Sequence, residues 1–217
     1  MMKKSCRNAL KETLDIYESA LEYRLAADEM MENIDQFWED DDGERMRKAS
    51  NAYDDSILTL ADAIRFALVT PDEYDVSLRA RTERVNAWCR QLGKRNVCLV
   101  SIHTNAAGNG KQWMNVRGWT CYTSKGQTAG DQLADCLYQA AALWLPGHKL
   151  WKDYSDGDPD WESDFYILKN TLCAAALTEN LFHDNSDDCL LLESDEGRRA
   201  IVALHVEGII NYVLKRY

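Results

Sequence analysis

Two polar residues occupy positions from which side chains of α/β proteins often carry out chemistry. His103 follows the apolar run of residues 96–102, and Glu179 follows an apolar run that ends at Thr178. Both runs are short and apolar, and the first is rich in β-branched residues, which is typical of a buried strand. Ligands of an open α/β sheet bind at the carboxyl ends of its strands. Two such strands would deliver an imidazole and a carboxylate to one edge of the sheet.

An imidazole and a carboxylate at one edge suit a metal ligand and a general base. A histidine-bound Zn²⁺ polarises a carbonyl and lowers the pKa of its bound water to about 7. A carboxylate close to that water takes its proton. The alternative is that His103 is a polar strand end and Glu179 a surface carboxylate, neither with a catalytic role. Spacing alone leaves both interpretations open.

The sequences around these two residues resemble motifs of a known family. Residues 101–108, SIHTNAAG, resemble the S-x-H-x-N-A motif of the zinc-dependent N-acetylmuramoyl-L-alanine amidases of type 3. Residues 177–182, LTENLF, resemble the later V-x-x-E-x-x-F motif of the same family. Shorter stretches from residue 69 to residue 168 are similar in the same order, so the resemblance covers residues 65–217.

The resemblance implies an activity and a set of site residues. The implied enzyme is a peptidoglycan hydrolase that cleaves the amide between N-acetylmuramic acid and L-alanine with zinc-activated water. It implies one Zn²⁺ ion, with His103 as a ligand and Glu179 as the catalytic base. Two further residues are predicted to bind the muropeptide substrate: Asn105 shapes the pocket, and Arg117 pairs with a carboxylate.

One part of the family's pattern is not found in the chain. Family members begin with a strand ending in a D-x-G-H-G-like motif, which supplies the first zinc histidine, and a glutamate ligand follows. This chain has no histidine before His103, whereas a catalytic zinc usually has three protein ligands. Candidates for the missing ligands are Glu22, Glu29, Glu44 and His183.

Two other hypotheses remain open because of this departure. In one, the chain is a catalytically inactive amidase-like protein that binds peptidoglycan fragments or a protein partner. In the other, the start of the amidase lies outside this chain. Zinc-dependent turnover would separate the active enzyme from both.

The composition divides the chain near residue 65. Residues 1–62 hold 8 Lys and Arg against 16 Asp and Glu, and all three prolines lie beyond residue 70. Apolar residues recur at helical spacing over residues 10–38 and 57–68, on either side of the acidic stretch 39–43. This pattern predicts a helical hairpin over residues 1–64. The apolar stripe of residues 10–38 also suits helix-mediated self-association.

Residues 65–217 are predicted to form an amidase-like α/β domain. Apolar runs predict strands over residues 96–102, 116–123 and 172–177, and helical spacing predicts helices over 128–145 and 194–214. A long loop rich in Asp and aromatic residues is expected over residues 147–169. Strands that alternate with helices imply an α/β fold, with a largely parallel open sheet flanked by helices.

Charge and hydropathy exclude several classes of partner. The net charge of -11 disfavours nucleic acid, and no apolar run reaches the length of about 20 residues that a membrane-spanning helix needs. Seven cysteines without a C-x-x-C pair indicate reduced thiols. The first residues have no apolar core of a signal peptide. We therefore expect a cytoplasmic protein that acts on the cell wall after release, as a bacterial or phage lysin would.

Overall fold

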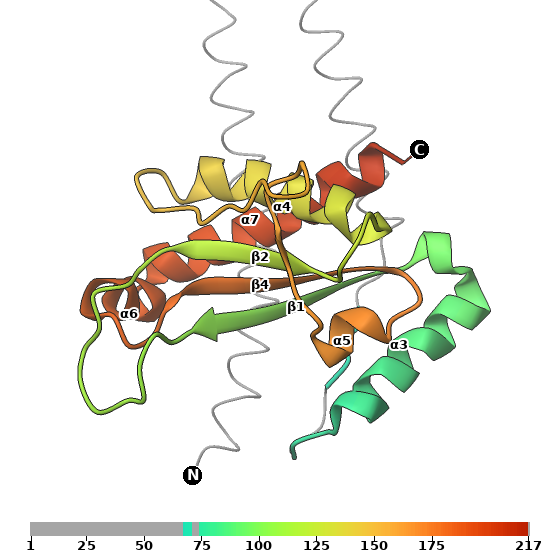
Figure 1. The fold of residues 1–217 in the computed structure, drawn as a ribbon, viewed down its shortest axis with the longest axis horizontal. Coiled ribbons are helices and arrows are strands. Elements are labelled where there is room, and N and C mark those ends of the chain that lie inside the picture. The colour runs from blue at the N-terminus through green and yellow to red at the C-terminus, as the bar shows by residue number, and fades with distance from the viewer. Residues whose placement is uncertain (1–66, 71–73, 217) are drawn as a thin grey trace, which may run out of the picture. The chain divides into compact units, whose positions relative to one another are not determined.

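The computed structural model describes residues 67–70 and 74–216. The helical hairpin predicted over residues 1–64 and its boundary with the α/β domain fall outside these residues and stay predictions. Figure 1 shows a sheet with helices on both faces. In chain order the elements are α3 (Leu78–Leu92), the 3₁₀ turn η1 (Lys94–Asn96), β1 (Cys98–Asn105), β2 (Trp119–Thr123), α4 (Ala129–Trp144), β3 (Trp161–Glu162), α5 (Tyr166–Lys169), β4 (Ala174–Phe182), α6 (Ser186–Glu193) and α7 (Asp195–Leu214).

The four strands lie in the order β1-β4-β2-β3. β1 is parallel to β4 and β2 is parallel to β3, whereas β2 runs antiparallel to β4. The predicted α/β sheet flanked by helices is confirmed, and it is a mixed sheet in which one antiparallel pair joins two parallel pairs. The direction of β2 follows from the loop of residues 106–118, which leaves the end of β1 and returns the chain along β4 from the same edge.

The central strand β4 is buried on both faces of the sheet. α4 and α7 cover one face, and α3 and α5 cover the other (Figure 1). Along β4, Ala174 and Ala176 pack with the α4 and α7 core, while Ala175 and Leu177 pack with the α3 and α5 core. A central strand buried on both sides needs apolar residues at every position, which explains the uninterrupted apolar run in the sequence.

Side-chain caps set the starts of the helices. Thr128 and Asp131 form a capping box at the start of α4, and Ser194 accepts a hydrogen bond from the Gly197 N–H at the start of α7. These two helices confirm the helices predicted over residues 128–145 and 194–214. Two further helices, α3 and α6, were not predicted, and they begin at the caps Ser77 and Asn185.

The three predicted strands are found, and two of them, β1 and β4, have longer carboxyl ends. β1 continues to Asn105 and β4 continues to Phe182, so His103 and Glu179 lie inside paired strands rather than after them. The pairing extends because the two strands stay in register up to these residues. The loop predicted over residues 147–169 also holds β3 and α5. No helix among the described residues is long and apolar enough to cross a membrane.

Candidate active site

His103 and Glu179 lie side by side. They are partners in the register of the parallel strands β1 and β4, and neighbouring strands are separated by about 4.8 Å. Partners in register point to the same face of a sheet, so the imidazole and the carboxylate share one face near the carboxyl ends of both strands. This is the placement that the two sequence runs predicted, and the catalytic roles of the two residues stay a proposal.

The His103 ring is held by its own strand. The Ser101 hydroxyl lies 2.9 Å from Nε2, because residues two apart on a strand face the same side. Atoms packed around the ring lower the imidazole pKa below its usual value, and the positive charge of Arg81 acts in the same direction. A neutral imidazole with one nitrogen fixed by a hydroxyl has the form that a metal ligand requires.

Glu179 is half-buried and keeps one carboxylate oxygen free. Its Oε2 is buried without a hydrogen-bond partner among the described residues. Burial raises the pKa of the Glu179 carboxyl above its usual value, and the nearby His183 partly opposes this. A carboxylate with a raised pKa and an unused oxygen suits a general base that works near neutral pH.

Asn180 holds the backbone of this site in place. The sequence analysis did not identify it as a site residue. It is 1% exposed. Its Nδ2 donates to the His103 carbonyl at 2.9 Å and to the Thr178 hydroxyl at 3.0 Å, and its Oδ1 accepts from Trp119 Nε1 at 2.8 Å. One side chain therefore links β1, β4 and β2 beside Glu179. The sequence signal that could have identified Asn180 is its place inside an apolar strand, because a buried amide needs hydrogen-bond partners.

The two strands change geometry directly after the site. Leu181 has a φ of 65° and is fully buried, and the β1–β4 register shifts between His103 and Asn105. A bulky residue with positive φ is uncommon and is held in place by the packing around it. Irregularities of this kind often lie beside active sites, where they redirect side chains.

The loop of residues 106–118 is tied to the chain that follows β4. The Asp184 carboxylate accepts hydrogen bonds from the N–H groups of Ala107 and Gly108, at 2.9 Å and 2.7 Å for Oδ2. Burial alone would raise the pKa of this carboxyl, but these hydrogen bonds outweigh it and lower the pKa. The Met114 N–H donates to the Asp184 carbonyl at 2.7 Å, and the Asn185 amide donates to the Met114 carbonyl at 2.9 Å.

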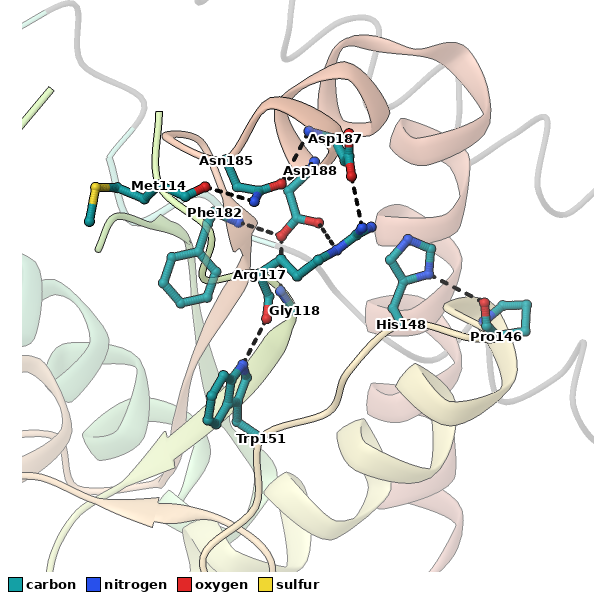
Figure 2. A network of polar contacts seen from close by, with 10 residues as sticks. All are labelled: Met114, Arg117, Gly118, Pro146, His148, Trp151, Phe182, Asn185, Asp187 and Asp188. Carbon is teal, nitrogen blue, oxygen red and sulfur yellow. Dashed lines mark hydrogen bonds and ion pairs between the residues drawn. The ribbon is translucent and has the colours of Figure 1, made fainter. Parts of the chain in front are cut away.

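Asp188 closes the same loop at its other end, as Figure 2 shows. This fully buried carboxylate accepts the N–H groups of Gly118 at 2.9 Å and Phe182 at 3.0 Å. Its Oδ1 lies 3.3 Å from Arg117 Nε, and Arg117 Nη1 lies 3.0 Å from the exposed Asp187 carboxylate. The first turn of α6 thus holds the loop that leads out of the His103 strand.

The two predicted substrate-binding residues both have partners within the chain. The guanidinium of Arg117 faces the two carboxylates of α6 (Figure 2). The Oδ1 of Asn105 accepts the N–H of Ala106 at 2.8 Å. Both residues lie at the ends of the loop of residues 106–118, and their contact with substrate stays a prediction. Among the large hydrophobic side chains of this loop, Trp113 is the most exposed, at 63%.

The other histidines do not join His103. His183 Nδ1 lies 3.2 Å from the Thr104 hydroxyl. His148 is partly buried, with its Nδ1 3.3 Å from the Pro146 carbonyl (Figure 2). His205 is buried on α7, and its Nε2 lies 2.8 Å from the Thr178 hydroxyl.

The described residues fit one part of a zinc site but not a complete one. Residues 67–70 and 74–216 contain no group of three His, Cys, Asp or Glu side chains placed to hold a metal ion. His103 is present with the chemistry of a zinc ligand, whereas Glu22, Glu29 and Glu44 lie outside the described residues.

Comparison with known proteins identifies the family. A family model described as N-acetylmuramoyl-L-alanine amidase matches residues 55–211. An endolysin of Bacillus phage SPP1 is 32% identical over 158 residues, which are 71% of this chain and 52% of that relative. The chain therefore spans about half the length of the curated relative that it matches.

Solved structures agree on the fold. The catalytic domain of CwlV, an N-acetylmuramoyl-L-alanine amidase from Bacillus (Paenibacillus) polymyxa var. colistinus, is 18% identical with a TM-score of 0.56, over 73% of this chain and 77% of that one. The amidase Ami1 from Mycobacterium smegmatis is 20% identical with a TM-score of 0.54, over 73% of this chain and 72% of that one. Since the family model matches most of the sequence, and since both motifs lie on the strands that form the candidate site, the chain belongs to the N-acetylmuramoyl-L-alanine amidase family.

Proposed function

We propose that this chain hydrolyses peptidoglycan at the amide between N-acetylmuramic acid and L-alanine. The observation that carries the proposal is the pairing of His103 with Glu179 in register on two neighbouring strands, in a chain of the amidase family. The peptidoglycan or a muropeptide is the substrate.

Glu179 is the general base of the proposed reaction. Its free Oε2 takes the proton of a water molecule that attacks the amide carbonyl, and the carboxyl then gives this proton to the departing amine of L-alanine. The half-buried position supports this role, because burial raises the pKa of the carboxyl towards the pH at which it must both accept and donate. Asn180 holds the neighbouring backbone and keeps Glu179 and His103 in register.

His103 is proposed as a ligand of one zinc ion. When bound, zinc polarises the amide carbonyl and lowers the pKa of water. Residues 1–66 contain no histidine, so any ligand from that part of the chain would be a carboxylate such as Glu22, Glu29 or Glu44, or a thiolate. The Ser101 hydroxyl keeps the His103 ring oriented.

The setting of the proposed reaction is the cell wall. The SPP1 relative is an endolysin, which supports the proposal that this chain acts as a phage-type lysin, made in the cytoplasm and released to the wall. Trp113 at the exposed loop, with Asn105 and Arg117 at the two ends of that loop, would contact the muropeptide. Self-association through residues 10–38 stays a prediction.

Hydrolysis of a purified muropeptide tests the proposal. The parent with zinc should release peptides with a new L-alanine amino terminus, and Glu179→Gln should lower the rate by about 10²–10⁴-fold. Glu193→Gln is the matched control, because Glu193 is exposed at the end of α6. Zinc content after dialysis, measured in the parent and in His103→Ala, tests the ligand role without using activity.

The outcomes separate the hypotheses. A Glu179→Gln protein that hydrolyses the muropeptide as fast as the parent would disprove the base. A parent that binds cell walls but neither retains zinc nor releases L-alanine peptides would establish the inactive binding protein in place of the enzyme.

A further inference from the structure

Three aromatic side chains form a cluster next to the candidate active site: Tyr122 on β2, Trp161 on β3 and Phe165 before α5. The Tyr122 ring centroid lies 6.5 Å from that of Trp161 and 5.3 Å from that of Phe165, at interplanar angles of 53° and 66°. Tilted and edge-to-face contacts of this kind are favourable between aromatic rings. Tyr122 is partly buried, whereas Trp161 is 36% exposed and Phe165 is 38% exposed. The cluster therefore presents aromatic surface to solvent.

The strand register places this aromatic cluster on the sheet face that carries Glu179. Tyr122 is the register partner of Leu177, and both pack with the α3 and α5 core. Glu179 follows Leu177 by two residues on β4, so it points to the same face. Diagonal neighbours on an antiparallel pair are about 7–8 Å apart, within reach of an aromatic side chain. The charge of Glu179 also contributes, after burial, to the raised pKa of the Tyr122 hydroxyl, which agrees with this proximity.

The two outer rings of the cluster add little to the core beneath them. That core is filled by side chains that are almost fully buried, such as Val85, Leu99 and Leu177. Trp161 and Phe165 each keep more than a third of their surface exposed. Single exposed hydrophobic residues are common, but exposed rings that adjoin one another beside a polar site are typical of a binding surface.

The charges around the cluster are paired within the chain. Lys125 and Lys169 both contact the Asp164 carboxylate, at 3.0 Å and 3.3 Å. The Glu162 carboxylate accepts a backbone N–H. A ligand on the cluster thus meets aromatic surface and compensated charges, with Glu179 as a nearby anion. A neutral ligand with apolar faces suits such a surface, whereas Glu179 would repel an anionic one.

We propose that Tyr122, Trp161 and Phe165 bind sugar rings of the peptidoglycan glycan strand. This inference rests on the proposed function, which makes peptidoglycan the substrate. Sugar rings are neutral and present C–H faces that stack on aromatic rings, whereas the stem peptide carries carboxylates that need cations. β3 lies two strand spacings from β4, about 10 Å. A glycan strand whose muramoyl residue reaches Glu179 therefore extends across the cluster, and the cluster favours substrates with more than one sugar.

Binding of a peptide-free sugar tests the proposal without using activity. Isothermal titration calorimetry measures the dissociation constant of a tetrasaccharide of alternating N-acetylglucosamine and N-acetylmuramic acid. Trp161→Ala and Phe165→Ala should each raise this constant by about 5–30-fold, as expected for an aromatic contact at the centre of an interface. Trp161→Phe keeps a ring and should retain most of the affinity. Trp144→Ala is the matched control and should leave the constant unchanged, because Trp144 is 41% exposed on α4, on the opposite face of the sheet.

Hydrolysis kinetics provide the second measurement. With zinc, the parent should have a lower KM for a muropeptide with four sugars than for one that carries N-acetylmuramic acid alone. Trp161→Ala should remove this difference by raising the KM of the longer substrate, with kcat unchanged. Circular dichroism checks that the variants fold, and Phe165→Ala carries the same test if Trp161→Ala does not.

The outcomes separate this inference from the proposed function. A parent that binds the tetrasaccharide through Trp161 but hydrolyses no muropeptide would refute the hydrolase and keep the glycan site. A parent that hydrolyses muropeptides, with Trp161→Ala and Phe165→Ala binding the tetrasaccharide as tightly as the parent, would refute the glycan site alone. A parent that does not bind the tetrasaccharide, or variants that lose affinity only for the free stem peptide, would overturn the glycan site too.

Discussion

Replacement of the buried Asp188 by alanine should destabilise the fold strongly. The carboxylate accepts the N–H groups of Gly118 and Phe182, and both are left without an acceptor in Asp188→Ala. An orphaned buried group costs about 1–3 kcal/mol, so the two together with the lost contact to Arg117 should cost about 3–5 kcal/mol of unfolding free energy. Asp188→Asn keeps one acceptor oxygen and should cost less than Asp188→Ala.

Asp187 provides the matched control for this prediction. It pairs with the same guanidinium of Arg117 at 3.0 Å, but its side chain is 67% exposed (Figure 2). Exposed ion pairs contribute about 0–1 kcal/mol, so Asp187→Ala should barely change stability. Urea unfolding followed by circular dichroism measures both variants, and with a slope of about 1–3 kcal/mol per molar the midpoint of Asp188→Ala should fall by at least about 1 M. Equal losses in the two variants would refute the argument that burial of the two N–H groups decides the cost.

Three further predictions concern single residues. Asn180→Ala leaves the Trp119 indole and the His103 carbonyl without partners, so urea unfolding should show a loss of about 2–4 kcal/mol; a loss below about 1 kcal/mol would contradict this. Burial lowers the pKa of His205 to about 4. The neutral, buried imidazole therefore contributes fully to the free energy of unfolding above about pH 6.5, and this contribution is lost as the pH falls towards 4. An NMR titration midpoint of His205 near 6.5 would disprove this pH dependence. A methyl group on Gly118 would lie 2.3 Å from the Lys149 carbonyl, so Gly118→Ala should lower the Tm far more than Gly110→Ala, where nothing lies within 4 Å.

The sequence predicted those elements whose local pattern is strong. The strands β1, β2 and β4 follow apolar runs, and α4 and α7 follow helical spacing behind the caps Thr128 and Ser194. α3 was missed because it buries only three residues, Thr82, Val85 and Cys89. The short helix α6 was missed because it buries only Asp188, although Asn185 followed by two acidic residues is a recognisable helix start.

The direction of β2 could not be predicted from its own residues. Strand direction depends on where the loop before it re-enters the sheet, and that is decided by contacts far apart in the sequence. Here the carboxylates of Asp184 and Asp188 hold the loop of residues 106–118 against the start of α6. The sequence shows only an acidic stretch after β4 at this point, and acidic residues on a surface turn have the same appearance.

The sequence predicted that His103 and Glu179 share one edge of the sheet, and it gave no role to Asn180, which links their strands. His103 and Glu179 could be found because each follows an apolar run and because the residues around them resemble two amidase motifs. Asn180 is adjacent to Glu179 in the sequence, but its three hydrogen bonds reach β1, β2 and its own strand. Such a role depends on which strands are neighbours, so it becomes visible only when the strand order is known.

Partial burial connects the fold of this sheet edge to its proposed chemistry. Burial acts in opposite directions on an acid and a base: it raises the pKa of Glu179 and lowers that of His103. The first shift brings the carboxyl closer to neutral pH, where a base that also donates works best. The second keeps the imidazole neutral, which metal binding requires. A fully exposed pair would lose both effects, and a fully buried pair would exclude the substrate, so the half-buried edge at the ends of β1 and β4 is where both requirements are met.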